Sequence, residues 1–190
     1  MHLVDVVLFL HILALLLAFG IGTTLHAGEW QSRKATTVGE LRAASRMGHR
    51  LAPLFPLLLV ALLGLGAWLV HLNDPEFSYE DGWISTAIVA VIVLLGIGGG
   101  LLAPRAKRMD DALDAAAPGD PLTEQLRAEV ADPVVWVGGH VNTFLALAVV
   151  FNMATKPDTV GAVVVLVVGV ALGGLIGLLG ARSAAAPVAA

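Results

Sequence analysis

The chain has 190 residues, of which 57% are hydrophobic and 14% are charged, and its mean hydropathy is +0.85. This composition is typical of a membrane protein and excludes an ordinary soluble domain. The net charge of -4 leaves no long basic tract that would favour nucleic acid as a partner, and the lack of cysteine excludes disulfides, thiolate metal sites and cysteine nucleophiles.

Five apolar stretches are long enough to cross a bilayer, which takes about 20 residues of helix because lipid offers the backbone no hydrogen bonds. In chain order they cover residues 3–27, 52–72, 83–103, 134–154 and 161–181. We therefore predict an all-α bundle of five transmembrane helices, forming a single domain over residues 1–181. The Ala-rich residues 182–190 are predicted to form a disordered tail.

The first stretch is as hydrophobic as a signal peptide but differs from one in two ways. It is longer than the usual core of a signal, and its beginning carries Asp5 and neither Lys nor Arg. We expect it to be retained as the first transmembrane helix.

The placement of charge predicts the orientation of the bundle. Every Lys and Arg except Lys156 lies in the connectors of residues 28–51 and 104–133 or after the last span, and these segments share one side of the membrane. Because basic connectors stay in the cytoplasm, the N-terminus is predicted outside and the C-terminus inside. This orientation requires an odd number of spans, which five satisfies.

The first cytoplasmic connector is predicted to contain a helix. Thr37 and Glu40 have the spacing of a capping box, and the helix should run towards the second span and bend or break near Pro53 and Pro56. Three arginines recur on it every four residues, which places them on one face at the cytoplasmic surface. We call Arg42, Arg46 and Arg50 the arginine face.

Glycines repeat every four residues at Gly169, Gly173 and Gly177 in the last span and at Gly96 and Gly100 in the third. Such ladders let helix backbones approach closely in lipid, where no hydrophobic drive brings helices together. Packing inside the bundle is the first interpretation of the ladder in the last span. A homo-oligomer, or a membrane-protein partner at this face, is the second.

Histidines are the side chains best able to carry chemistry, because Asp and Glu are nearly absent from the span interiors. His11 lies about two turns into the first span from outside, and His140 about two turns into the fourth span from inside. His26 and His49 are expected near the cytoplasmic boundary, and His71 near the outer one.

A neutral imidazole is a good axial ligand for haem iron, and apolar helices with glycine gaps can admit a porphyrin between them. From their depth, we predict a haem b site with His11 and His140 as iron ligands, offset by something under ~10 Å. His26 or His49 with His140 is an inner alternative, and His11 with His71 is an outer one. The propionates of an inner haem would pair with the arginine face.

Simpler roles account for the same side chains. A single intramembrane histidine can hydrogen-bond across helices, for example to Asn142, Thr23 or Thr24. Histidines and arginines at the membrane boundary commonly contact phospholipid headgroups. The histidines nearest the boundary and the arginine face are the side chains to which these roles apply most directly.

Three segments resemble known proteins: "LHILALLLAFGIGTTLHAGEW" in the first span, "SRMGHRLAPLFPLLLVALLGLGAWLV" leading through the second, and "HVNTFLALAVVFNMATKP" in the fourth. The pattern resembles the group of small bacterial membrane proteins around the copper-resistance D protein and the membrane-bound protoporphyrinogen oxidase. Within that group, it is most similar to an uncharacterised branch of predicted integral membrane proteins.

The resemblance implies a haem b site or a copper-related role, carried chiefly by His11 and by His140, in the inner (plasma) membrane of a bacterium. A copper role has less support, because the four methionines are dispersed. No enzymatic reaction follows from the resemblance. We expect a small haem b-binding redox or electron-relay protein. The alternatives are a non-enzymatic accessory subunit of a larger membrane complex and a transporter of a small solute or metal.

Overall fold

The structure is a computed structural model that describes the backbone of residues 2–185 and the side chains of residues 2–182. In chain order its helices are α1 (Leu3–Ser32), α2 (Val38–Leu51), α3 (Leu54–Leu72), α4 (Gly82–Leu95), the π-helix η1 (Gly96–Leu102), α5 (Ala103–Asp114), α6 (Glu124–Val130), α7 (Pro133–Thr155) and α8 (Thr159–Ala185). The described residues contain no strand, only an isolated β-bridge between Thr37 and Pro121.

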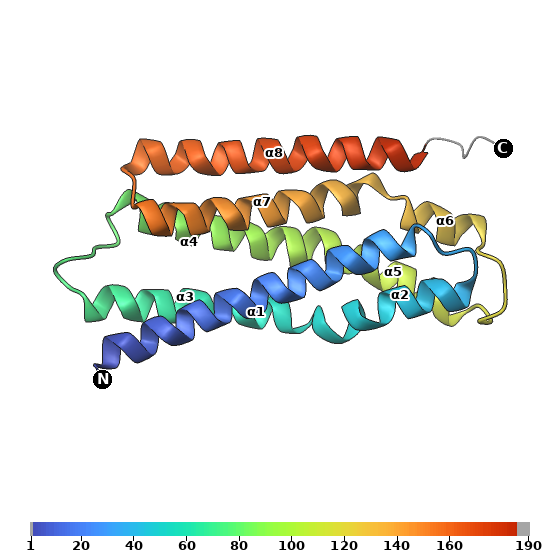
Figure 1. Ribbon diagram of the computed structural model, residues 1–190, viewed down its shortest axis with the longest axis horizontal. Coiled ribbons are helices and arrows are strands. Elements are labelled where there is room, and N and C mark those ends of the chain that lie inside the picture. The colour runs from blue at the N-terminus through green and yellow to red at the C-terminus, as the bar shows by residue number, and fades with distance from the viewer. Residues whose placement is uncertain (1, 186–190) are drawn as a thin grey trace.

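Five helical segments of the described chain are long and apolar enough to cross a membrane, which confirms the predicted all-α bundle of five spans. They are Leu3–Ser32, Val38–Leu72, Gly82–Asp114, Glu124–Thr155 and Thr159–Arg182. The segments run alongside one another, and α2, α5 and α6 gather at one end (Figure 1). We call this the basic end, and the other the opposite end.

The last helix is longer than predicted. It continues to Ala185, so the first residues of the predicted tail of residues 182–190 are helical. Residues 186–190 lie outside the described residues.

Side-chain caps stabilise several helix starts, and the sequence predicted the one at Thr37. Thr37, Asp132 and Asp158 each accept a hydrogen bond from a backbone N–H in the following turn, at 3.3, 2.8 and 2.8 Å. Each cap satisfies a donor that the helix itself leaves unpaired. The break between α2 and α3 falls at Ala52 and Pro53, next to the prolines that predicted it.

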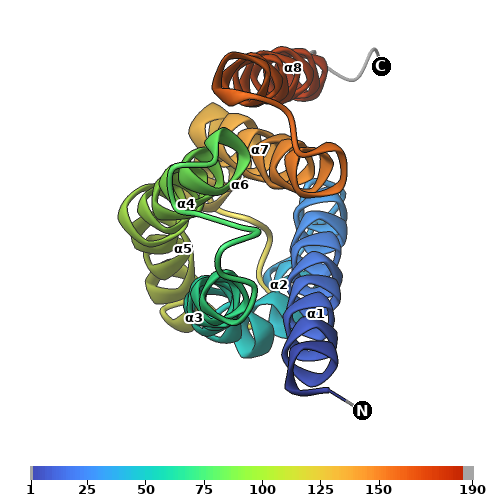
Figure 2. The same ribbon diagram turned by 90° about the vertical axis from the view of Figure 1, so that its left-hand side faces the viewer.

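Four helices surround the middle of the bundle and the fifth lies outside them. Seen from the opposite end, α1, α3, α4 and α7 form a ring, with α8 on the outer side of α7 (Figure 2). A cluster of small and branched apolar residues joins the four inner helices: Ala14, Ala18, Leu59, Leu62, Ala90, Val91, Leu94 and Leu145. Large apolar side chains on the outside are exposed, as a surface that faces lipid requires.

The glycine ladder of the last span packs against α7. A Cβ on Gly169 would lie 2.8 Å from the carbonyl oxygen of Phe144, one on Gly173 2.7 Å from that of His140, and one on Gly177 2.7 Å from a backbone atom of Val137. Any side chain here would push the two backbones apart. The ladder therefore serves packing inside the bundle. Because α7 covers this face of α8, the face is not open to another copy of the chain or to a membrane-protein partner.

A second small core closes the basic end. Its buried residues come from α2, the end of α5 and the segment through α6: Val38, Leu41, Leu113, Leu122 and Leu126. Arg42 of the arginine face donates hydrogen bonds to the carbonyl oxygens of Leu113 at 2.6 Å and Ala116 at 3.4 Å. Leu113 lies in the last turn of α5 and Ala116 just beyond its end, where a helix leaves carbonyl groups without a partner in the helix. Arg42 thus links α2 to α5.

Candidate functional site

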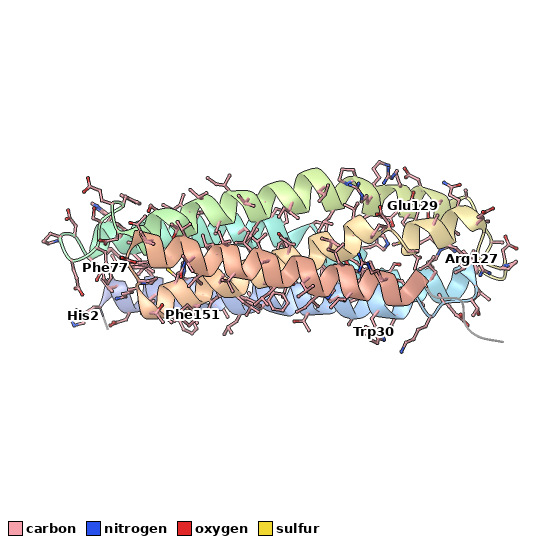
Figure 3. The ribbon with its side chains drawn as sticks, turned by 90° about the horizontal axis from the view of Figure 1, so that it is seen from above. His2, Trp30, Phe77, Arg127, Glu129 and Phe151 are labelled. Carbon is pink, nitrogen blue, oxygen red and sulfur yellow. The ribbon has the colours of Figure 1, made fainter. Side chains whose placement is uncertain are left out.

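A cavity of about 1080 Å³ lies between α1, α3, α4, η1 and α7. It reaches from Phe77 and Lys156 at the opposite end to His49 and Asp110 at the basic end. Figure 3 marks the two ends of the bundle, with His2 and Phe77 at one and Glu129 at the other. Most lining side chains are apolar, and the volume is at the upper end of what small-molecule sites occupy, about 300–1,000 Å³. The cavity is therefore the candidate binding site.

His11 lines this cavity in the half towards the opposite end. Its ring packs on Gly66 of α3, where an added Cβ would lie only 3.3 Å from Cε1 of the imidazole. The Nδ1 atom is buried and has no hydrogen-bond partner among the described residues. Of the predicted ligands, His11 is thus the one with an unsatisfied buried nitrogen in the cavity wall.

His26 lies near the basic end of α1 and uses both ring nitrogens. Its Nε2 is 2.7 Å from Oγ1 of Thr143 on α7, and its Nδ1 is 3.2 Å from Oε2 of Glu29, one turn further along α1. His26, Glu29 and Thr143 all line the cavity. A backbone position without a side chain makes this approach possible, since a Cβ on Gly139 would lie 3.0 Å from Cε1 of His26.

His140 contacts His26 but does not line the cavity. The ring centroids of the two imidazoles are 5.1 Å apart, and Nδ1 of His140 bonds to the carbonyl oxygen of Trp136 at 2.8 Å. The guanidinium carbon of Arg33 lies 3.7 Å from the ring centroid of Trp136. Burial lowers the pKa of Arg33, an effect that the neighbouring Glu29 carboxylate opposes.

The structure does not bring His11 and His140 together. His140 is next to His26, and His11 is roughly 22 Å from His26 along α1 at about 1.5 Å per residue. The separation is more than twice the offset predicted from the sequence, so a single iron cannot bind both rings. The inner alternative, His26 with His140, is the predicted pair whose rings are in contact.

The remaining predicted residues lie apart from that pair. His49 is exposed at the basic end, where its Nε2 is 2.8 Å from Oδ1 of Asp110. His71 is exposed and does not line the cavity, so the outer pair with His11 is not formed. Arg46 and Arg50 are exposed and also lie outside the cavity lining. None of the three side chains of the arginine face therefore points a charge into the cavity.

Sequence reasoning missed Glu29, Thr143, Arg33 and Trp136 as members of the site. The pair His26 and Glu29 has the i, i+3 spacing that puts two side chains on one helix face, and this signal was available. The sequence carries no such signal for the contacts with α7, because they depend on how two helices that are distant in the sequence align. The π-helix η1, which lines the cavity with Gly98 and Gly99, also gave no signal beyond its run of glycines.

The described residues contain no group of three or more His, Asp or Glu side chains arranged to hold a metal ion. Five apolar spans, four of which line the cavity, place the protein in the class of polytopic helical membrane proteins. The family model described as "Predicted integral membrane protein (DUF2269)" matches residues 5–157, and the chain belongs to this family. No curated protein and no solved structure matches the chain.

Membership of a family of predicted integral membrane proteins agrees with part of the resemblance drawn from the sequence. The relation to the copper-resistance D protein and to protoporphyrinogen oxidase is not shown by this match and stays a prediction. The matched residues begin within α1, include α2 to α7 and end before α8.

Proposed function

We propose that the protein binds haem b in the half of the cavity that contains His11 and acts as a small redox or electron-relay protein of the bacterial inner membrane. One observation carries the proposal: an imidazole in the wall of a large apolar cavity has a buried nitrogen without a partner. Leaving a buried polar atom unpaired costs about 1–3 kcal/mol, and a ligand at the ring offsets this cost.

The surroundings of His11 suit one imidazole ligand. Because Gly66 has no side chain, the His11 ring lies close to the α3 backbone. The apolar wall of the cavity would exclude water from the ring and from a haem bound to it. No second imidazole lies at this depth among the described residues, so His11 alone would bind the iron, in contrast to the pair predicted from the sequence. Haem b, when bound, would supply one-electron transfer at its iron.

Propionate groups would need a different partner from the one predicted. The arginine face belongs to α2 at the basic end, far from His11. Lys156 lines the cavity at the opposite end, and its Nζ atom lies 4.2 Å from the ring centroid of Phe77. We propose that Lys156 would pair with the propionates of a haem bound at His11.

A visible absorption spectrum tests the proposal. Protein produced with ample haem supply should purify with a Soret band, and iron with a single imidazole ligand should be high-spin. His11→Ala should remove the band, whereas His2→Ala should retain it. Loss of the band in His140→Ala or His26→Ala instead would move the site to the inner pair. Folded, monodisperse and colourless wild-type protein would overturn the proposal and favour the accessory subunit or the transporter.

A further inference from the structure

Four of the polar side chains that line the cavity towards the basic end lie where α1 meets α7. His26 and Glu29 come from α1, and Asn142 and Thr143 come from α7. We call these four residues the polar pocket. His26 is bonded to Glu29 and Thr143. Asn142 differs from the others, because its Oδ1 atom is buried and has no hydrogen-bond partner among the described residues.

Most charged side chains near the polar pocket already have partners. Arg105 bonds to Asp132 at 3.0 Å, and His49 lies 2.8 Å from Asp110. Lys107 bonds to Asp111, and Arg108 lies 3.7 Å from Glu129. Arg33 lines the cavity and stacks on Trp136, and its Nη2 is buried without a hydrogen-bond partner among the described residues, but its charge interacts with the Glu29 carboxylate of the polar pocket. An anionic head in the polar pocket would have to compete for these cations and would face Glu29 as well. The distribution of charge therefore favours an uncharged head.

The wall beside the polar pocket leaves room for an apolar chain. Gly98 and Gly99 of η1 line the cavity, and a Cβ on either would meet nothing within 4 Å. The same part of the bundle is close to the polar pocket, because Leu102 of η1 contacts Gly138 of α7, next to the glycine that faces His26. A π-helical turn is uncommon and is frequently found at functional sites.

We infer that the polar pocket binds the hydroxyl head of an uncharged membrane lipid alcohol, whose hydrocarbon chain lies in the cavity along Gly98 and Gly99. A hydroxyl group can donate a hydrogen bond to Oδ1 of Asn142, which has no partner in the described part of the chain. It can also accept one from the Thr143 hydroxyl, whose proton would then turn away from the carbonyl oxygen of Gly139, 3.1 Å from Oγ1. Binding is favoured because the hydrocarbon chain is transferred from water to the apolar cavity. A prenyl alcohol and a quinol share this head chemistry.

The inference does not depend on haem at His11. The two sites are roughly 22 Å apart along α1 at about 1.5 Å per residue, and they use different side chains. An absorption spectrum reports on the first site and lipid labelling on the second, so either proposal can fail while the other stands.

Photoaffinity labelling of the full-length protein in detergent tests the inference. A farnesol analogue with a diazirine on its chain should label residues of η1 and the facing parts of α1 and α7. Unlabelled farnesol or a decyl-substituted benzoquinol should compete, and the better competitor identifies the source of the hydroxyl. Farnesyl phosphate should compete at least tenfold less well. Equal competition by farnesyl phosphate, or labelling confined to the lipid-facing surface of α8, would overturn the inference.

Variants on α7 give a matched comparison. Thr143→Val removes a hydroxyl from the polar pocket and should weaken farnesol binding up to about tenfold, the value of one hydrogen bond. Thr143→Ser should restore it. Thr155→Val is the control, because its hydroxyl bonds to the carbonyl oxygen of Phe151 at 2.8 Å and does not line the cavity. Asn142→Leu provides a second loss variant. Binding unchanged in both loss variants would contradict the inference.

Discussion

The imidazole rings of His26 and His140 lie 5.1 Å apart, with their planes inclined by 49°. Trp136 also contacts His140, again at 5.1 Å between ring centroids, and Arg33 stacks on Trp136. The contacts therefore run from His26 of α1 through two side chains of α7 to Arg33, which directly follows α1. These side chains join two helices that otherwise share few backbone contacts, since α1 packs mainly on α2 and α3, and α7 on α4 and α8.

Arg33 should stabilise the junction of three helices. It stacks on Trp136 of α7, and its Nη1 donates to the carbonyl oxygen of Gly180 on α8 at 3.0 Å. Arg33→Ala should lower the free energy of unfolding by about 1–3 kcal/mol, from the lost cation–π contact and hydrogen bond. Lys34→Ala is the control, because Lys34 is exposed and lies 5.4 Å from the Trp30 ring centroid. Thermal unfolding in detergent should show a clear loss only for Arg33→Ala.

Close contact between α7 and α8 should make the glycine ladder intolerant of bulk. In Gly173→Leu the added Cβ would lie 2.7 Å from the carbonyl oxygen of His140. We expect the free energy of unfolding to fall by about 1–3 kcal/mol or more. Leu178 is 48% exposed on another face of α8, so Leu178→Ala should cost less. Equal losses of thermal stability in the two variants would contradict the packing that the structure shows.

Arg42 and Arg46 should behave differently although they are one turn apart. Arg42 bonds to the end of α5, whereas Arg46 is exposed. Arg42→Ala should therefore speed amide hydrogen exchange over residues 103–126, consistent with the loss of about 1 kcal/mol or more of local stability. Arg46→Ala should leave the exchange of this segment unchanged. Similar exchange in both variants would show that the guanidinium does not hold α5.

Reporter fusions test the predicted orientation. Tyr79 lies between α3 and α4, and Pro118 lies between α5 and α6 at the basic end. A reporter at Tyr79 should be active outside the cytoplasm and one at Pro118 inside it, because basic connectors are retained on the cytoplasmic side. Both reporters on the same side would be incompatible with the five spans, and an exchange of sides would reverse the orientation.

The fold was largely predictable, and the alignment of its helices was not. Hydropathy located all five spans, and the capping-box spacing of Thr37 and Glu40 located the start of α2. The depth of the histidines was misjudged, because hydropathy marks where a segment is apolar and not where its helix ends. Helix α1 continues to Ser32, which places His26, and not His11, beside His140.

The sequence by itself determined that this is a five-span membrane protein, because crossing lipid requires long apolar helices whatever their neighbours are. Of its two glycine ladders, the one in the last span permits close packing, whereas a Cβ on Gly96 or Gly100 of the other would meet nothing within 4 Å. Only the tertiary structure decided that α7 occupies the ladder of α8, that Arg42 bonds to α5, and that His26 meets Thr143 and His140. The reason is physical: contacts between helices depend on their relative shift and rotation, which packing across the whole bundle determines and no single helix encodes.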